Sequence, residues 1–388
     1  MSPETQDTAV SQALEMGRPV AGEEEKIYVA SQWQLMWWRF RKHKMAMVGG
    51  AILIIYYTLA IFCEFVAPHD PLKFDPKLVF VPPQKIHFRD EKGFRWPPFI
   101  YGIKQQIDPV SYRRTYVPDP EKRFTVTFFA RGDPYKLWGL FQTNVHLIGT
   151  VSVDGKIGPL YLLGTDRMGR DMLSRLFYGA RISLSIGLVG VFVSLILGIL
   201  MGGFSGYYGG VFDTISQRLI EFLRSVPHLP LWMALSAAVP PFWSPVKVYF
   251  GITVVLSLIG WTGMARVVRG RFLALREEDF VMAARLAGSG EFRIVVRHMV
   301  PSFLSHIIAS ITIAIPNMIL GETALSFIGV GLRPPVISWG VMLQEAQSLA
   351  TVALAPWLLV PGLAVVVAVL CFNFLGDGVR DAADPYAR

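Results

Sequence analysis

Long apolar stretches alternate with polar segments along the chain. Several of these stretches run for about 17 to 22 residues, close to the roughly 20 that a helix needs to cross a bilayer core. Because unpaired backbone groups are costly in lipid, such stretches predict transmembrane helices. We expect six, at 45–66, 182–203, a Pro-containing segment from Pro227 to Pro240, 249–265, 303–320 with an extension toward 328, and 357–375.

The polar segments divide the chain into four parts. We expect a cytoplasmic segment at 1–44, the first transmembrane helix at 45–66, an insert at 67–163 and a core at 164–388 with five further spans. The insert is polar and Pro-rich, and its alternating run from Arg123 to Phe129 predicts a strand. The expected fold class is therefore an all-α membrane protein with six transmembrane helices and an extracytoplasmic insert that contains some β structure.

Charge fixes the expected orientation in a cell (inner) membrane. The stretch from Trp33 to Lys44 is aromatic and basic, as in an interfacial helix on the cytoplasmic side. The short loop at 266–297 carries seven Arg and four acidic residues, which also favours the cytoplasm. Both termini are then cytoplasmic. The first 30 residues are polar and predict no cleaved signal peptide.

Composition narrows the function classes. Hydrophobic residues make up 52% of the chain and charged residues 17%, which is unusual for a soluble domain. The net charge of +8 does not indicate nucleic acid, because much of the basic excess flanks apolar stretches. Cys63 and Cys371 lie inside apolar runs, and no His/Cys cluster predicts a metal site.

The loop at 266–301 has a pattern of its own. Apolar residues recur at helical spacing from Phe280 to Ala287, Gly288 and Gly290 interrupt them, and a second short helix is expected from Phe292 to Met299. Two short helices joined by a tight turn would form a compact knob with an apolar side and a charged rim, suited to a partner's groove.

The spacing of Ala283, Ala284, Gly288 and Pro301 resembles the EAA loop of permease subunits in binding-protein-dependent ABC importers. The resemblance implies a type I permease fold and a loop that couples the spans to an ATP-hydrolysing subunit. The implied coupling residues are Ala283, Ala284, Arg285, Gly288, Phe292 and Pro301. Met282 stands where the family has an acidic residue, and His298 stands at a usually aliphatic position.

Further segments resemble the oligopeptide/dipeptide/nickel branch: Leu163 to Leu184, Glu322 to Leu332, Ser338 to Gly340 and Val379 to Pro385. The branch implies a second homologous permease, two ATPase subunits and an extracytoplasmic solute-binding protein as partners beside membrane lipid. Peptides are the first expected cargo, followed by oligosaccharides or opine-like conjugates and then nickel. A secondary transporter and a scaffold protein are the alternatives from other classes.

The chain holds no Gly-x-x-x-x-Gly-Lys-Ser/Thr phosphate loop and no catalytic constellation that stands out. We therefore expect no enzyme activity and no cofactor on this chain, with ATP and magnesium held by partner subunits.

Four features outside the loop are candidates for further roles. Glu322 and Asn317 lie in an apolar stretch, where they would line the pathway or hold helices together. Small residues at Gly198, Gly202 and Gly206 predict close helix packing. His306 predicts a structural hydrogen bond rather than a proton relay. The group Asp166, Arg170 and Asp171 would contact a binding protein or form a local ion-pair cluster.

Overall fold

A computed structural model describes residues 32–90, 93–107, 109, 112, 114–152, 158–240 and 242–383. Within these ranges five helical segments are long and apolar enough to span a membrane. They are Lys44–Ile61 (α4), Met172–Tyr208 (α6), Pro245–Leu275 (α9), His306–Ile328 within α13 (Leu304–Ile328), and Pro356–Ala382, which joins η3 (Pro356–Leu359) to α16 (Val360–Ala383).

Shorter elements connect these helices. They are α3 (Gln32–Lys42), α5 (Cys63–Val66), α7 (Gly210–Ser225), α8 (His228–Ala237), α10 (Asp279–Leu286), α11 (Glu291–Arg293), η1 (Ile294–Met299), α12 (Val300–Ser302), α14 (Trp339–Gln344), η2 (Glu345–Gln347) and α15 (Leu349–Leu354). The helix expected before the first span is confirmed as α3. The expectation of no signal peptide falls on residues outside the described ranges, as does the end of the carboxyl tail.

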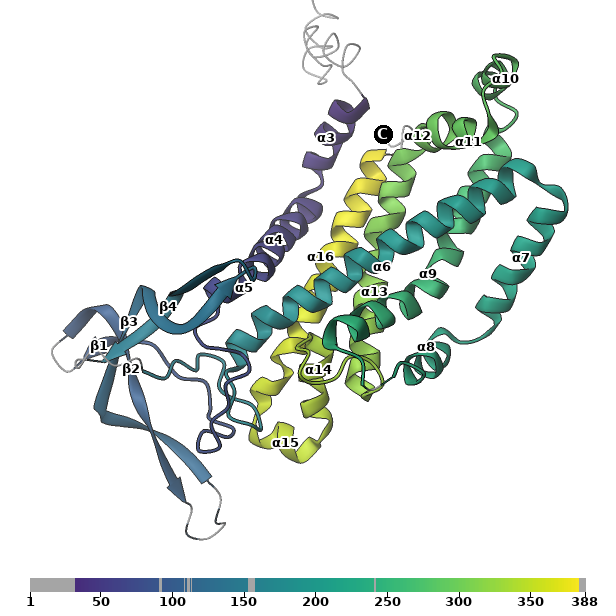
Figure 1. The fold of residues 1–388 in the computed structure, drawn as a ribbon. Coiled ribbons are helices and arrows are strands. Elements are labelled where there is room, and N and C mark those ends of the chain that lie inside the picture. The colour runs from purple at the N-terminus through teal and green to yellow at the C-terminus, as the bar shows by residue number, and fades with distance from the viewer. Residues whose placement is uncertain are drawn as a thin grey trace, which may run out of the picture.

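The long helices α6 and α9 run parallel, because Gly190 lies beside Ser257 and Gly202 lies beside Ala265. Both helices therefore finish at the same end of the bundle, where α10 to α12 also lie (Figure 1). We call this the loop end. The opposite end, which carries α14, α15 and the β-sheet, is called the sheet end.

The structure differs from the expected six continuous spans at one segment. The region after Pro227 forms only the 10-residue α8, which is too short to cross a bilayer alone. Val226 is extended, as the residue before a proline tends to be, so α7 and α8 cannot join into one helix. Since α6 ends and α9 begins at opposite ends of the bundle, α7 and α8 make the return crossing in two pieces (Figure 1).

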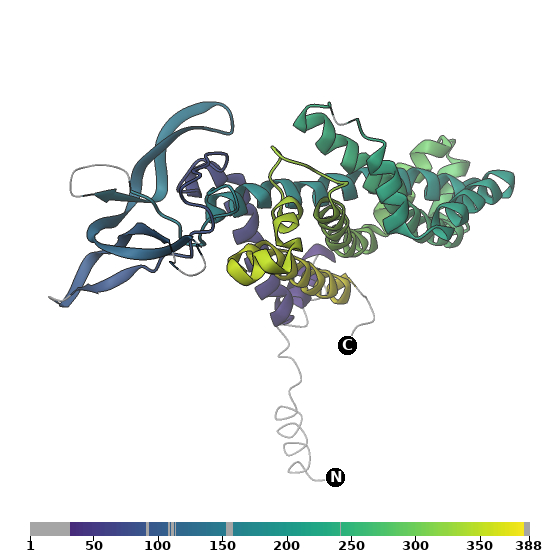
Figure 2. The ribbon, with the colours of Figure 1, turned by 90° about the horizontal axis from the view of Figure 1, so that it is seen from below.

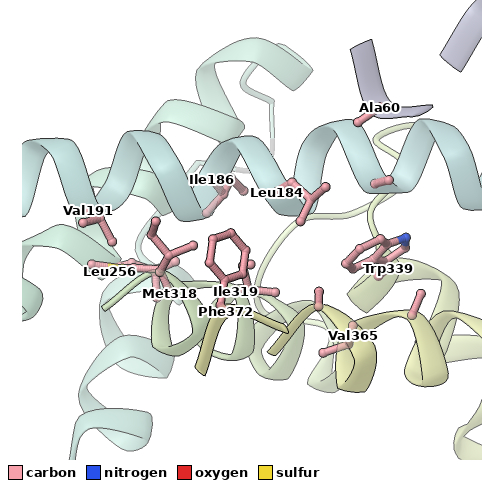
Figure 3. Packing of buried hydrophobic residues seen from close by; sticks show 14 of the residues in the cluster. Ala60, Leu184, Ile186, Val191, Leu256, Met318, Ile319, Trp339, Val365 and Phe372 are labelled. Carbon is pink, nitrogen blue, oxygen red and sulfur yellow. The ribbon is translucent and has the colours of Figure 1, made fainter. Parts of the chain in front are cut away.

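Apolar side chains from several helices meet in one core. Ile186 of α6, Leu256 of α9 and Ile319 of α13 are each almost completely buried, and Trp339 of α14 closes the cluster toward the sheet end (Figure 3). Phe372 and Val365 of α16 complete the packing against α13. This core explains why the expected spans at 249–265, 303–320 and 357–375 form helices that lie together.

The predicted glycine stripe lies at the contact between α6 and α9. A Cβ added at Gly202 would lie 2.3 Å from the carbonyl oxygen of Ala265, and one at Gly198 would lie 2.6 Å from the Cβ of Met264. At Gly206 the nearest atom would be the Cβ of Phe272, at 2.7 Å. The absence of side chains at these positions lets the two helix backbones approach closely, so the packing interpretation is confirmed.

The insert forms an antiparallel sheet of β1 (His87–Asp90), β2 (Gly93–Ile107), β3 (Arg114–Leu137) and β4 (Phe141–Ser152), in that order. The strand expected at 123–129 is confirmed as part of β3. Seen from below, the sheet stands to one side of the helices (Figure 2). The ring of His146 joins the sheet to the bundle, because its Nδ1 lies 2.5 Å from the carbonyl oxygen of Ala67 after α5.

We expect the substitution Gly202→Ala to lower the melting temperature of the purified protein, because the new methyl group would meet backbone atoms that cannot rotate away. Overpacking of this kind costs about 1–3 kcal/mol. The control is Gly270→Ala in α9, where an added Cβ has no neighbour within 4 Å. Alanine favours helices over glycine, so the control should melt at the same or a higher temperature. Equal behaviour of the two variants would contradict the close contact.

Candidate functional site

The segment from α10 to α12, which we call the knob, projects from the loop end. Its first helix stops at Leu286, where the backbone turns through Gly288 with a φ of +75°. The Gly288 N–H donates to the Arg285 carbonyl at 2.9 Å, and the Ser289 N–H donates to the Ala284 carbonyl at 3.0 Å. Glycine suits this left-handed position because it has no Cβ to clash with the backbone.

The inner side of the knob is built from α10 and η1. Val281 and Ala284 lie one turn apart on α10 and are buried against Ile294, Val295 and Met299. The same cluster includes residues from the ends of the long helices, namely Tyr207 of α6, Phe272 of α9 and Phe303 before α13. The knob is therefore held firmly on the loop end of the bundle.

One polar contact strengthens this attachment. The guanidinium of Arg285 lies 4.9 Å from the ring centre of Tyr207, and its Nε donates to the Tyr207 hydroxyl at 3.2 Å. Both a cation–π contact and a hydrogen bond thus join α10 to the end of α6. Among the predicted coupling residues, Arg285 and Ala284 face the bundle.

The outer side of the knob leaves large apolar side chains exposed. Leu286 is 88% exposed and Phe292 is 62% exposed, while Phe280, Met282 and Val296 are each more than one-third exposed. Ala283 and Gly288 are exposed on the same knob. The apolar residues at helical spacing therefore do not share one buried face, because Phe280, Ala283 and Ala287 are exposed and only Ala284 is buried. Such a cluster of exposed apolar residues is typical of a protein interaction surface.

The helical hydrogen-bond pattern changes between α11 and α12. η1 is a π-helix, in which the Val300 N–H bonds to the Val295 carbonyl five residues back. Pro301 is the second residue of α12 and has no N–H to donate, so the regular ladder of hydrogen bonds cannot continue there. The predicted residue Pro301 therefore marks the point at which the knob ends and the chain enters α13.

Glu322 lies at the sheet end of α13 and is completely buried. Its carboxylate accepts hydrogen bonds from Ser183 of α6 at 3.0 Å, Ser326 of α13 at 2.8 Å and Ser338 at 2.7 Å. Ser183 also accepts from the Trp339 N–H at 3.1 Å. One carboxylate thus joins α6, α13 and α14, so of the two alternatives for Glu322 the geometry favours helix packing.

Asn317 has a different environment, although it lies little more than one helical turn from Glu322. Its side chain is exposed and helps to line a cleft of about 550 Å³ between α8, α9 and α13. Arg224, His228 and Thr262 contribute polar groups to the same cleft. The two residues that the sequence grouped together therefore separate, with Asn317 in the cleft and Glu322 inside the protein.

The predicted group at 166–171 lies before α6 and is buried. Asp166 accepts from Arg170 Nε at 2.6 Å and pairs with Arg175 at 3.0 Å, while Arg170 also donates to Glu345 at 2.9 Å. Burial and the neighbouring Asp166 carboxylate raise the pKa of Glu345 above its usual range. This arrangement is the ion-pair cluster that was one of the two alternatives.

Asp171 caps the start of α6, where its carboxylate accepts from the Ser174 N–H at 2.8 Å and from the Ser174 hydroxyl at 2.6 Å. Burial raises the pKa of the Asp171 carboxyl. Because Asp166, Arg170 and Asp171 are each less than one-tenth exposed, a docked protein would reach little of them. Their suggested contact with a binding protein stays a prediction.

Sequence reasoning missed three charged partners at the sheet end. Arg175 and Glu345 belong to the Asp166 cluster, and Glu64 forms a bidentate pair with Arg181 at 2.6 and 2.5 Å. Glu64 and Arg175 lie in or beside apolar stretches, where a charge needs a partner, so that signal would have found these two but not Glu345. Within the described ranges, no three His, Cys, Asp or Glu side chains come together as metal ligands.

The fold and the knob define a helical, multi-span membrane protein with an interaction surface at the loop end. Residues 194–388 match the family described as the binding-protein-dependent transport system inner membrane component, and residues 31–83 match the N-terminal TM domain of oligopeptide transport permease C. The chain belongs to this family of transport-system inner membrane components. The resemblance based on Ala283, Ala284, Gly288 and Pro301 is therefore confirmed.

Three relatives illustrate the similarity. The dipeptide transport system permease protein DppC of Bacillus subtilis (strain 168) is 37% identical over 58% of this chain and 68% of its own length. The oligopeptide transport system permease protein OppC of Haemophilus influenzae is 38% identical, over 59% of this chain and 71% of its own. The dipeptide transport system permease protein DppC of Lactococcus lactis is 32% identical over 92% and 91%, so its alignment extends through the insert.

We expect Glu322→Ala to destabilise the protein strongly, because it leaves three buried serine hydroxyls without their acceptor and opens a cavity. Leaving buried polar groups unpaired costs about 1–3 kcal/mol each. Glu322→Gln keeps the volume and one carbonyl oxygen, so its melting temperature should fall less. Thermal unfolding of both variants in detergent tests this order. An alanine variant as stable as the original protein would contradict the role in packing.

Proposed function

We propose that the chain is a permease subunit of an ATP-driven importer that translocates dipeptides or oligopeptides delivered by a solute-binding protein. The observation that carries the proposal is the structure of the knob. Its inner side packs against three long helices, and its outer side exposes Leu286 and Phe292, which a partner could contact. The family is a permease component rather than a catalyst, and the sequence lacks a phosphate loop. A separate subunit would then bind ATP and magnesium.

The knob has the properties that docking requires. An apolar centre gains free energy when a partner covers it, and a charged rim keeps the surface soluble before assembly. Exposed charges of both signs surround the apolar residues, including Glu277, Glu278, Arg293 and Arg297. We infer that the ATPase subunit receives Leu286 and Phe292 in a groove and contacts the rim with its own charges.

Movement of the docked subunit would reach the spans through the inner side. Val281 and Ala284 are buried with Tyr207 of α6 and Phe272 of α9, so a displacement of α10 acts on both helices together. ATP-driven closure of two ATPase subunits would then rock the helices between outward-open and inward-open states. This alternating access is the mechanism that family membership supports.

A second homologous permease subunit would complete the pathway. Asn317 in the cleft is exposed on this chain, and α7 next to the cleft exposes Ile215 and Phe222, which are 64% and 68% exposed. An equivalent chain could cover these residues and enclose the cleft between the two subunits. Polar groups of the cleft, such as Arg224 and Asn317, would then face the cargo.

The loop end is the cytoplasmic end in this proposal. It collects the basic residues of α3, including Arg39, Arg41 and Lys42, together with the Arg residues of the 266–297 loop and Arg380 of α16. Short segments next to membrane spans carry their Lys and Arg residues on the cytoplasmic side. Both termini then lie in the cytoplasm, and the sheet lies outside the inner membrane.

The peptide cargo rests on the names of the relatives, which are dipeptide and oligopeptide permease proteins. Oligosaccharides and opine-like conjugates are the competing cargoes, since a mainly apolar cleft whose polar groups include Arg224 and Asn317 suits any of these molecules.

We expect Leu286→Asp to reduce co-purification of the ATPase subunit at least tenfold without changing the melting temperature, because a charge replaces an exposed apolar contact. The control is Leu349→Asp in α15, since Leu349 is also 88% exposed but lies at the sheet end. The control should retain the ATPase subunit. Normal co-purification of the Leu286→Asp variant would exclude the knob as the docking surface.

We expect proteoliposomes that contain the assembled transporter to accumulate labelled dipeptide or oligopeptide only when the solute-binding protein and internal ATP are both present. An imposed proton or sodium gradient should not replace ATP. Uptake of an oligosaccharide in preference to peptides would change the cargo but keep the importer. Uptake driven by the ion gradient alone would favour a secondary transporter instead.

A further inference from the structure

The turn between β3 and β4 lies directly beside the end of the first span. The indole Nε1 of Trp138 donates to the carbonyl oxygen of Ile61 at 2.8 Å, and its ring centre lies 5.4 Å from that of Phe62. In Figure 1 the β3–β4 hairpin reaches across to α5, next to the end of α4. One part of the sheet is thus held at the point where the chain leaves the membrane.

The length of α4 places this contact at a defined depth. Lys44–Ile61 has 18 residues, which at 1.5 Å per residue span about 27 Å, close to the roughly 30 Å of a bilayer core. The Ile61 carbonyl then lies near the boundary between hydrocarbon and headgroups. Trp138 is bonded to that carbonyl, and tryptophan is enriched at this boundary because its ring is apolar and its N–H is polar.

The residues around Trp138 are apolar and exposed. We call Leu137–Phe141 the hairpin tip. Leu140 is 76% exposed, Phe141 is 63% exposed and Trp138 is 47% exposed. A soluble β-hairpin normally carries polar residues at its turn, so an exposed group of this kind marks an interaction surface.

The backbone conformation of the tip makes a tryptophan at this position unusual. The Leu140 N–H donates to the Leu137 carbonyl at 3.0 Å, and Trp138 and Gly139 both have positive φ, of 52° and 75°. Such a turn favours Asn, Asp or Gly at its two central positions. The chain places a tryptophan there instead, which directs the indole to the end of α4.

The tip continues the lipid-facing surface of α4. Ile54 and Ile55 of that helix are 70% and 56% exposed, and Ile61 is 50% exposed beside the tip. In a membrane span, exposed isoleucines of this kind face lipid. The hairpin tip is an apolar surface next to these isoleucines, at the same depth as the Ile61 carbonyl. At that depth it contacts lipid, and no protein partner is needed to cover it. The occupant that the observations favour is therefore the bilayer rather than another protein.

We propose that the hairpin tip inserts into the bilayer leaflet at the sheet end and anchors the sheet to the membrane surface beside α4. The anchor limits how far the sheet can swing relative to the helices, because it adds an attachment to lipid to the contacts that His146 makes at Ala67 and Trp138 makes at Ile61. This inference depends only on the membrane location of the chain and does not depend on its cargo or its ATPase partner.

The test measures the depth of a nitroxide label at the tip. Leu140→Cys is combined with Cys63→Ala and Cys371→Ala, labelled, and reconstituted as the full chain in lipid nanodiscs. Power saturation then compares collisions with oxygen, which concentrates in lipid, and with a nickel chelate, which stays in water. We expect oxygen collisions to exceed nickel collisions severalfold at Leu140.

The matched control is Phe94→Cys, because Phe94 is 74% exposed in β2 and pairs with Arg89 of the edge strand β1. Its label should collide more with nickel than with oxygen. A nickel-dominated label at Leu140 would overturn the proposal by placing the tip in water. A label shielded from both reagents would also overturn it, because a protein partner would then cover the tip.

Discussion

The close contact of α6 with α9 is the constraint on which the remaining structure depends. Gly198, Gly202 and Gly206 leave room for the backbone of α9, and no side chain could occupy that space without moving one of the helices. The contact makes two parallel helices behave as one unit. Because parallel helices need a return crossing between them, it also requires a connection across the bundle, which α7 and α8 supply in two pieces. The cleft next to Asn317 is lined in part by this segment, through Arg224 of α7 and Trp232 of α8.

The two ends of this unit are stabilised by different chemistry. At the sheet end, buried charges are held by matched partners, with three hydroxyls on Glu322 and arginines on Asp166. Each of these contacts depends on direction and distance, so together they fix the positions of α6, α13 and α14. At the loop end the contacts of Val281 and Phe272 are apolar and less directional, and they are supplemented by the contact of Arg285 with Tyr207. The ion pair of Arg269 with Asp213 lies at the same end. The proposed coupling through the knob would therefore act on an end whose packing is mainly apolar.

Local patterns in the sequence predicted most of the helices and one strand. They could not predict contacts between residues that lie far apart in the chain. Apolar length predicted the long helices, glycine spacing predicted their closest contact, and the alternating run after Arg123 predicted a strand. The prediction of a third span from Pro227 to Pro240 was too simple. Prolines, rather than hydropathy, determine the bounds of the short helix α8 in this region. The roles of Glu322 and Asn317 could not be separated from sequence, since the five positions between them turn the side-chain direction by about 140° around α13, from the cleft to the core. Glu345 was missed because its partners lie 170 or more residues away in the chain.

The interpretation of the knob needs both the sequence pattern and the structure. The spacing of Ala284 and Gly288 indicates a turn, but only the structure assigns an inner side and an outer side to it. Ala284 is small because Val295 and Met299 lie against it, and Gly288 is a glycine because the backbone there is left-handed. Neither property involves a partner. Leu286 is different, because it is apolar at an exposed position where folding alone would permit any polar residue. A binding partner would explain the leucine there. The spacing that resembles the family's loop therefore describes how the knob is built, and the proposed ATPase partner would account for the exposed leucine.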